Sequence, residues 1–280
     1  MTMLLPAFTS APEPGRVYHT DLFTLCDAMP SASVDMVLMD LPYGTTACSW
    51  DTVIPFEPMW ARLKRIIKPR GAIVLTASQP FTSALVMSNP GWFRYVWTWN
   101  KKYHSNPFLS GTQPLRVTED VLVFSSEQGA YFPQVRKRPD EWLRMKPSFA
   151  HKNGAIFGKS ATDHPNSGGR DWMFPINLLD FPLDNPNTRE TTHPTQKPVA
   201  LFEYLIRTYT REGELVFDGV VGSGTTAVAA RNCKRNFICG DKELDYVLTA
   251  RDRLRMPFEA RQKPVINDVS DLPLFASATS

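Results

Sequence analysis

The sequence predicts an α/β fold, with a doubly wound, mostly parallel sheet that carries an irregular lobe. Two apolar runs, over residues 34–40 and 71–78, are typical of strands buried on both faces. A third run, over 214–217, passes through a glycine-rich turn into the alanine-rich segment 227–230, which is the order strand, turn, helix. Because helical segments separate the strands, crossover connections and a mainly parallel sheet are expected.

The other elements follow in chain order. Residues 1–15 are rich in Pro, Ser and Thr and are expected to form a loose arm. Trp60, Leu63 and Ile67 share one side of a helix predicted over 58–67, which the sequence Lys-Pro-Arg-Gly ends. The remaining patterns predict a short helix over 81–87, strands over 93–99 and 121–124, a helix over 199–210, a strand over 237–241 and a helix over 244–255.

Composition divides the chain into four parts. Between residues 129 and 171 eight Lys and Arg stand against four Asp and Glu, and regular periodicity fades among scattered aromatic residues. The change predicts an irregular basic lobe inserted into one α/β domain. The expected parts are the first half of that domain over 16–128, the lobe over 129–190, the second half over 191–255 and a tail over 256–280.

Charge and cysteine content narrow the class of protein. The net charge is +3 and the isoelectric point is near 8.6, which permits a nucleic-acid partner without requiring one. The four cysteines form no C-x-x-C pair, so no zinc or other metal site and no disulfide framework are expected. Residues 1–10 do not resemble a signal peptide, and no apolar run approaches the ~18 residues of a membrane span. A reducing, cytoplasmic setting without membrane contact is therefore expected.

The glycine turn predicts a site for a nucleoside cofactor. Asp218 ends one strand and Asp241 ends the next, 23 residues later, where an acid commonly bonds ribose hydroxyls. Glycines allow the backbone to approach a ligand closely, and the N-terminus of the following helix attracts an anionic group. Thr225 and Thr226 stand where hydroxyls and amides can hold a carboxylate. An ordinary βα turn is the alternative, whereas a phosphate-binding loop is disfavoured because no Lys follows Gly224.

A second strand ends in Asp40-Leu41-Pro42-Tyr43, which suits chemistry on an exocyclic amine. The amine of adenine or cytosine is a poor nucleophile because its lone pair is delocalised into the ring. Accepting one N–H at the Asp40 carboxylate and one at the Leu41 carbonyl increases the electron density on nitrogen as charge develops. Pro42 fixes the backbone, and Tyr43 can stack on a base that has left the duplex. The alternative is a strand-end turn with a buried Tyr.

A third motif, His-Pro-Thr-Gln-Lys-Pro, contains His193, Thr195, Gln196 and Lys197 and stands directly before a helix. One interpretation is a loop that covers the cofactor. The other is a proline-rich linker whose Pro198 starts the helix. Spacing alone leaves both interpretations open.

Along the chain, Asp-x-Pro-Tyr comes first, a variable lobe and then His-Pro-Thr-Gln-Lys-Pro follow, and the glycine turn with Asp218 comes last. This order of motifs resembles that of the β-class DNA amino-methyltransferases, which depend on S-adenosylmethionine (AdoMet). The resemblance spans about residues 18–254, apart from the lobe. Segments 96–101 and 119–124 resemble later strands of that family, and 19–22 resembles its N-terminal segment against the cofactor adenine. The resemblance implies a Rossmann-like methyltransferase sheet, bound AdoMet, a target-recognition lobe over 129–190 and a homodimer.

The motifs and the resemblance together assign roles to residues. Asp40, Leu41, Pro42 and Tyr43 are expected to be catalytic. The expected cofactor-binding residues are Asp21, Leu22, Asp40, His193, Thr195, Gln196, Lys197, Asp218, Gly219, Val220, Gly222, Ser223, Gly224, Thr225, Thr226 and Asp241. Lobe residues expected to contact DNA phosphates are Arg136, Lys137, Arg138, Arg144, Lys146 and Lys152, with a solvated charged surface as the alternative.

Two positions depart from the pattern of that family. It commonly has Asp-Pro-Phe at the glycine turn, whereas this chain has Asp218-Gly219-Val220. A phenyl face against the cofactor adenine is therefore replaced by the smaller Val220. Leu41 stands where that family frequently has Pro. The difference is compatible with the proposed chemistry, because only the backbone carbonyl of this residue is used.

These observations predict a site-specific methyltransferase that acts on N6 of adenine in double-stranded DNA after base flipping. The motif begins with Asp, as in the adenine enzymes that it resembles, and not with Ser, as in the cytosine-N4 group. Two alternative targets, N4 of cytosine in DNA and a base in RNA, would require the same methyl-transfer chemistry. The alternative of a different class is a catalytically silent DNA-binding protein. A nicotinamide dehydrogenase is disfavoured because the turn is not G-x-G-x-x-G. The protein is expected at the nucleoid, encoded by a bacterium or a phage; the recognition sequence and any restriction partner stay open.

Overall fold

The computed structural model describes residues 8–44, 52–105, 107–137, 172–183 and 196–255. These residues form two compact units, each described by itself. The larger unit contains the described parts of Met1–Tyr131 and Asn177–Glu259, and the smaller one those of Phe132–Ile176. Among the described residues, no helix combines the length and the apolar character needed to span a membrane.

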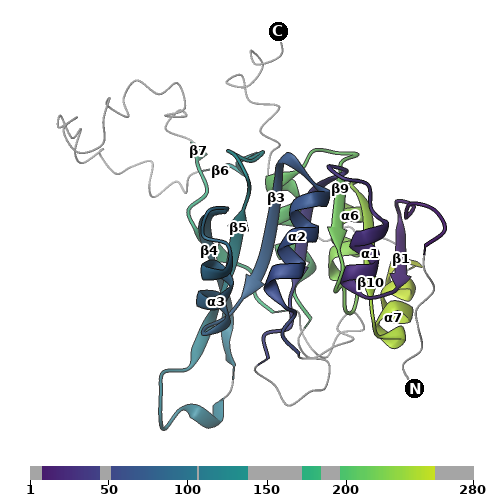
Figure 1. The fold of residues 1–280 in the computed structure, drawn as a ribbon. Helices are drawn as coiled ribbons and strands as arrows, with labels where there is room; N and C mark the ends of the chain where they lie inside the picture. Colours follow the sequence, from purple (N-terminus) through teal and green to yellow (C-terminus); the bar gives the residue numbers. More distant parts are fainter. Residues whose placement is uncertain (1–7, 45–51, 106, 138–171, 184–195, 256–280) are drawn as a thin grey trace. The chain divides into compact units, whose positions relative to one another are not determined.

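One sheet organises the larger unit (Figure 1), with the strands in the order β1-β10-β9-β2-β3-β5-β4-β8. The strands are β1 (Arg16–His19), β2 (Val34–Asp40), β3 (Ile67–Ala77), β4 (Phe93–Ser105), β5 (Arg116–Phe124), β8 (Leu178–Asp180), β9 (Leu215–Asp218) and β10 (Asn236–Asp241). Neighbouring strands run parallel except where β5 is one of the pair. The predicted mostly parallel, doubly wound sheet is therefore confirmed.

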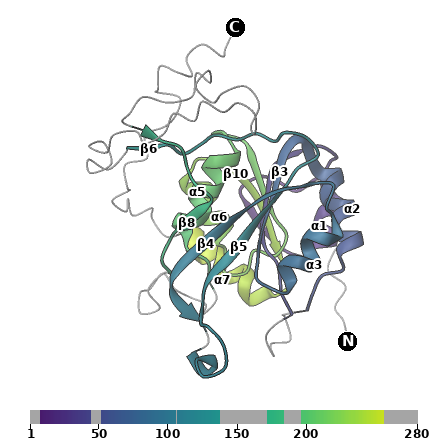
Figure 2. The same ribbon diagram turned by 90° about the vertical axis from the view of Figure 1, so that its left-hand side faces the viewer.

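Two layers of helices cover the two faces of this sheet (Figure 2). One layer contains α1 (Leu22–Ala28), α2 (Phe56–Ile66) and α3 (Phe81–Ser88), and the other α5 (Val199–Tyr209), α6 (Thr225–Asn232) and α7 (Leu244–Arg255). A short 3-10 helix, η1 (Pro107–Leu109), lies between β4 and β5. Helices on both faces leave the carboxyl ends of the parallel strands as the open edge, which is where ligands bind in such sheets.

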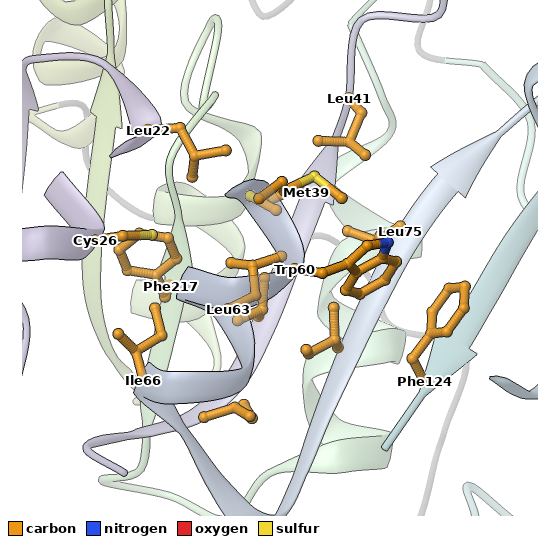
Figure 3. Packing of buried hydrophobic residues seen from close by; sticks show 14 of the residues in the cluster. Leu22, Cys26, Met39, Leu41, Trp60, Leu63, Ile66, Leu75, Phe124 and Phe217 are labelled. Atoms are coloured by element: carbon orange, nitrogen blue, oxygen red, sulfur yellow. The ribbon is translucent and has the colours of Figure 1, made fainter. Parts of the chain in front are cut away.

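The core lies between the sheet and the layer that contains α2 (Figure 3). Trp60, Leu63 and Ile66 recur at helical spacing on α2 and are buried, as the sequence predicts for Trp60 and Leu63. The Trp60 ring packs 4.9 Å from that of Phe124, and its Nε1 donates to Ser88 Oγ. This helix therefore fixes β3 and β5 against each other behind the open edge.

Two boundaries differ from the prediction. The residues Lys-Pro-Arg-Gly lie within β3, because the helix ends at Ile66 and the strand begins at Ile67. The β2–β3 register shifts between Val34 and Met36, and such an irregularity accommodates a proline that cannot donate to the ladder. Strands β4 and β5 are also longer than predicted, since their outer parts do not alternate apolar with polar residues.

The smaller unit contains a two-stranded antiparallel ladder among its described residues. It pairs β6 (Arg136–Lys137) with β7 (Trp172–Met173). Within the segment 129–190, β8 belongs to the larger unit, where it pairs in parallel with β4. The boundaries predicted for the lobe stay a prediction.

Candidate active site

Three carboxylates stand at the carboxyl ends of strands that are neighbours in the sheet. Asp241 ends β10, Asp218 ends β9 and Asp40 ends β2, and these strands lie in the order β10-β9-β2. A cavity of about 750 Å³ opens at this edge, and all three acids line it. Its volume lies within the range of small-molecule and cofactor sites. Two motifs that are far apart in the sequence therefore share one cavity.

The glycine turn after β9 is shaped by close contacts. A Cβ at position 219 would lie 2.1 Å from Cδ1 of Leu22, so a larger residue there would displace the Leu22 side chain at the start of α1. Gly224 has φ +90° at the N-cap of α6, and a Cβ there would meet Ala250. No side chain caps α6, so its first N–H groups stay available to a ligand.

Asp218 and Asp241 are buried carboxylates that hold the turn. Asp218 accepts from the Val220 amide at 2.9 Å and from the Thr226 hydroxyl, and burial raises its pKa from 3.8 to about 7. Asp241 accepts from the amides of Gly222 and Glu243, both at 2.9 Å, and burial also raises its pKa. Each oxygen of Asp241 keeps a second acceptor position, which suits the two hydroxyls of a ribose.

Asp40 is the centre of a compact polar cluster at the other end of the cavity. Its Oδ1 accepts from the Thr76 hydroxyl and lies 2.9 Å from the Tyr43 hydroxyl, while its Oδ2 lies 2.7 Å from Lys197 Nζ. A carboxylate has about four acceptor positions, so Oδ2 keeps one after this ion pair. The Asp40 side chain is 31% exposed, which leaves that position accessible from the cavity.

Lys197 joins Asp40 to a second buried ion pair. Its Nζ lies 3.5 Å from Glu119 Oε2, and Lys101 Nζ lies 3.1 Å from Glu119 Oε1. Burial alone lowers the pKa of Lys197, but Asp40, Tyr43 and Glu119 together hold that pKa well above its ordinary value. Acidic and basic side chains therefore alternate in the row Asp40, Lys197, Glu119, Lys101, and Lys197 stays protonated in the neutral range.

Tyr43 lies in contact with both the acid and the core. Its ring stacks on Phe81 with centroids 5.3 Å apart, and Lys197 Nζ lies 5.6 Å from the ring centroid. Burial raises the pKa of its hydroxyl well above the usual value, and the Asp40 charge adds to this effect. Stacking of Tyr43 on a target base stays a prediction.

Most of the predicted cofactor and catalytic residues meet at this cavity. Those that line it are Asp21, Leu22, Asp40, Leu41, Pro42, Tyr43, Gln196, Lys197, Asp218, Gly219, Val220, Gly222, Ser223, Thr225, Thr226 and Asp241. Gly224 shapes the turn at the start of α6. The Asp21 carboxylate caps α1 by accepting from the amides of Phe23 and Thr24 and from the Thr24 hydroxyl, which is a structural use of this side chain.

Some predicted residues lie elsewhere in the chain. His193 and Thr195 of the third motif, and Arg138, Arg144, Lys146 and Lys152 of the lobe, lie outside the described residues. Arg136 and Lys137 form β6 of the smaller unit and are exposed.

Sequence reasoning missed the groups that support Asp40. Thr76, Lys101 and Glu119 were not assigned to the site, although the last two belong to segments that resemble strands of the family. Their spacing alone gave no reason to select them. Phe23, Glu243 and Tyr246 also line the cavity, and Phe23 and Tyr246 are aromatic.

The chain is similar in sequence to known DNA methyltransferases. A sequence model of the family described as DNA methylase matches residues 34–252. The chain is 28% identical to Type II methyltransferase M1.MboII of Moraxella bovis, over 84% of this chain and 94% of that protein. It is also 28% identical to Type II methyltransferase M2.DpnII of Streptococcus pneumoniae, over 84% and 88%.

Solved structures share the fold. The M1.HpyAVI–SAM complex aligns with a TM-score of 0.57 and 23% identity, over 86% of this chain and 99% of that one. The cytosine-N4-specific PvuII DNA methyltransferase aligns with a TM-score of 0.61 and 16% identity, over 90% of each chain. At these identities the alignments establish the architecture of the sheet and its helices, and leave the target base open.

Proposed function

Because this chain belongs to the DNA methylase family and its cofactor is AdoMet, we propose that it transfers the methyl group to N6 of adenine in duplex DNA. The observation that carries the proposal is the shared cavity, with Asp40 at one end and the glycine turn with Asp241 at the other. A flipped base and a nucleoside cofactor need two adjoining subsites of this kind.

The residues present fit AdoMet. Asp241 offers two oxygens to the ribose hydroxyls, and the uncapped N-terminus of α6 suits the carboxylate of the methionine part. Phe23, Val220 and Tyr246 supply an apolar border for an adenine ring. When bound, AdoMet supplies a methyl group on a positively charged sulfur. The residues Leu22 and Gly219 bring α1 and the turn together around that site.

The residues at the other end activate the amine. The free acceptor position of Asp40 Oδ2 takes one N–H of the target, and the Leu41 carbonyl takes the other, since the Leu41 side chain is buried in the core. Thr76 donates to Oδ1 and Lys197 to Oδ2, so the two side chains hold the Asp40 carboxylate in place. Positive charge that develops on the nitrogen is then stabilised by an oriented carboxylate.

The choice of adenine rests on Asp40 as the first residue of the motif, which resembles the adenine enzymes. Cytosine-N4 is the competing target, because the same acceptors suit any flipped base with an exocyclic amine. Relatives named Type II methyltransferases support a site-specific modification enzyme, with a restriction partner as a further possibility. Exposed Arg136 and Lys137, with Arg138, Arg144, Lys146 and Lys152, are proposed to contact phosphates. A homodimer is proposed from the resemblance alone.

The test uses purified protein, AdoMet with an isotopically labelled methyl group, and unmethylated plasmid DNA. The DNA is digested to nucleosides, which are separated by mass spectrometry. Labelled N6-methyladenine is the expected product. Labelled N4-methylcytosine as the only product overturns the adenine assignment, and no labelled nucleoside supports a catalytically silent DNA-binding protein. Light scattering on the same preparation tests the dimer, which a mass near 31.6 kDa contradicts.

A further inference from the structure

The hairpin that joins β4 to β5 extends from the sheet as a separate projection (Figure 1). We define the β4–β5 arm as residues 101–117, which include the end of β4, η1 and the start of β5. The strands pair through Asn100 and Thr118, and again at Ser105 and Arg116 after an irregularity. The arm is therefore held by strand pairing at its base.

The arm lies at the same edge of the sheet as the catalytic motif. Asp40 pairs with Thr76 near the carboxyl end of β3, and the adjacent Ala77 pairs with Asp120 of β5. Because β5 runs antiparallel to β3, the residues that precede Asp120 continue beyond that edge. Leu109 and Arg116 also line the cavity that contains Asp40. The arm therefore forms part of the wall of the cavity that contains Asp40.

The surface of the arm combines exposed apolar and aromatic side chains with positive charge. Phe108 at the tip is 93% exposed, and Tyr103, Leu109 and Val117 are exposed as well. Lys102 and Arg116 are its exposed cations, whereas Lys101 is buried in the ion pair with Glu119, and no Asp or Glu occurs from residue 101 to residue 118. Single exposed apolar residues are common, but such a cluster on one projection is typical of a contact surface.

We propose that the β4–β5 arm binds duplex DNA beside the target nucleotide, with Phe108 packed against bases and Lys102 against a phosphate. This rests on the proposed function, because it takes duplex DNA as the substrate. Apolar side chains inserted at base steps unstack them, and a flipped base leaves a neighbour without a stacking partner. Lys102 is bonded to Asp180 at 2.7 Å, but both side chains are about half exposed, so a phosphate can replace this weak partner.

The arm is a different segment of the chain from the basic lobe predicted over 129–190, and its residues belong to the larger unit, whereas Arg136 and Lys137 belong to the smaller one. A polyanion fits the surface since the arm has cations and no acids. A second copy of the chain is the competing occupant, and it would use the apolar residues alone. If duplex DNA occupies the arm, a Phe108 substitution weakens DNA binding. If a second copy occupies it, the substitution lowers the mass of the particle in solution.

The experiment compares wild type with Phe108→Ala, Phe108→Trp and Lys102→Gln. Leu248→Ala is the matched control, because Leu248 is an exposed apolar residue on α7, beside the opposite end of the strand order. The measurements are the KM for plasmid DNA in methyl transfer, filter binding of the same labelled DNA, the AdoMet Kd and light scattering. Filter binding measures the contribution of the arm to DNA binding even if the wild-type protein makes no methylated adenine. Failure of the arm proposal can therefore be distinguished from failure of the proposed function.

Phe108→Ala is expected to raise the KM and the Kd for plasmid DNA about 5- to 100-fold, the range for loss of one base–aromatic contact, with the AdoMet Kd unchanged. Phe108→Trp is expected to restore DNA binding, and Leu248→Ala to match wild type. Lys102→Gln is expected to make the salt dependence shallower by about 0.9 in log–log slope. The proposal is overturned if Phe108→Ala has the same KM and Kd for plasmid DNA as wild type. If those values are unchanged and the mass of the particle is lower, the arm binds a second copy of the chain.

Discussion

Replacing Lys197 with Met tests whether its ammonium group positions Asp40 or binds the cofactor. In the structure Nζ lies 2.7 Å from Asp40 Oδ2 and 3.5 Å from Glu119 Oε2, whereas the resemblance assigns the residue to the methionine part of the cofactor. Met keeps most of the side-chain length and removes the charge. The Lys197 backbone carbonyl, which accepts from the Thr225 hydroxyl, is unaffected.

The magnitude follows from these contacts. A hydrogen bond to a charged group contributes about 1.5–3 kcal/mol, so losing one that positions Asp40 lowers methyl transfer about 10- to 100-fold. The variant also leaves two carboxylates facing each other. Removing one partner of a buried ion pair costs about 3–5 kcal/mol, and the partial exposure of Asp40 reduces the expected loss of unfolding free energy to roughly 1–3 kcal/mol.

The assay is single-turnover transfer of labelled methyl to plasmid DNA, with calorimetric AdoMet binding and thermal unfolding on the same preparation. Lys197→Met is expected to transfer slowly and to bind AdoMet normally. Lys68→Met is the matched control, because Lys68 pairs with Asp35 at the far end of β2, and it is expected to leave the rate unchanged. A normal rate combined with an AdoMet Kd raised about tenfold refutes the reasoning and places Nζ on the cofactor.

Three further predictions concern the cofactor end and the lobe. Asp241→Ala is expected to raise the AdoMet Kd by about 10- to 100-fold through loss of charged hydrogen bonds, measured by calorimetry; an unchanged Kd would move the ribose contact to another acid, such as Glu243. Asp218 holds its proton more tightly when folded than when unfolded, so its contribution to the free energy of unfolding is complete below pH about 4 and is lost as pH rises through about 7. Asp218→Asn is expected to flatten this part of the Tm–pH curve, and an unaltered curve contradicts the assignment. Replacing Arg136, Lys137 and Arg138 together with Gln is expected to reduce the salt slope of DNA binding by up to about 0.9 per lost phosphate contact; an unchanged slope moves the contacts elsewhere.

Much of the site could be predicted because it lies at strand ends. An apolar run followed by a polar residue locates the carboxyl edge of a parallel sheet, and Asp40, Asp218 and Asp241 each follow such a run. The rule needs only local sequence, since the sheet itself brings those ends together. The order of the motifs then suggested the cofactor and the family.

The remainder depends on packing between segments that are distant in the sequence. Lys197 meets Asp40 across 157 positions, and no local pattern indicates which of two buried lysines does so. Glu119 belongs to a strand whose residues do not alternate, so its burial was not predictable from periodicity. Strands β4 and β5 were likewise predicted to be shorter, because their outer parts lack the period-two signal.

The central claim is that one cavity holds the cofactor at its glycine turn and activates the target amine at Asp40. Asp40→Ala separates the two functions, so the decisive measurement is labelled methyl transfer to plasmid DNA and AdoMet binding on one folded preparation of that variant. We predict that transfer falls by about 10²-fold or more while the AdoMet Kd changes little. Near-normal transfer by a folded Asp40→Ala protein would contradict the account, since the amine would then be activated elsewhere.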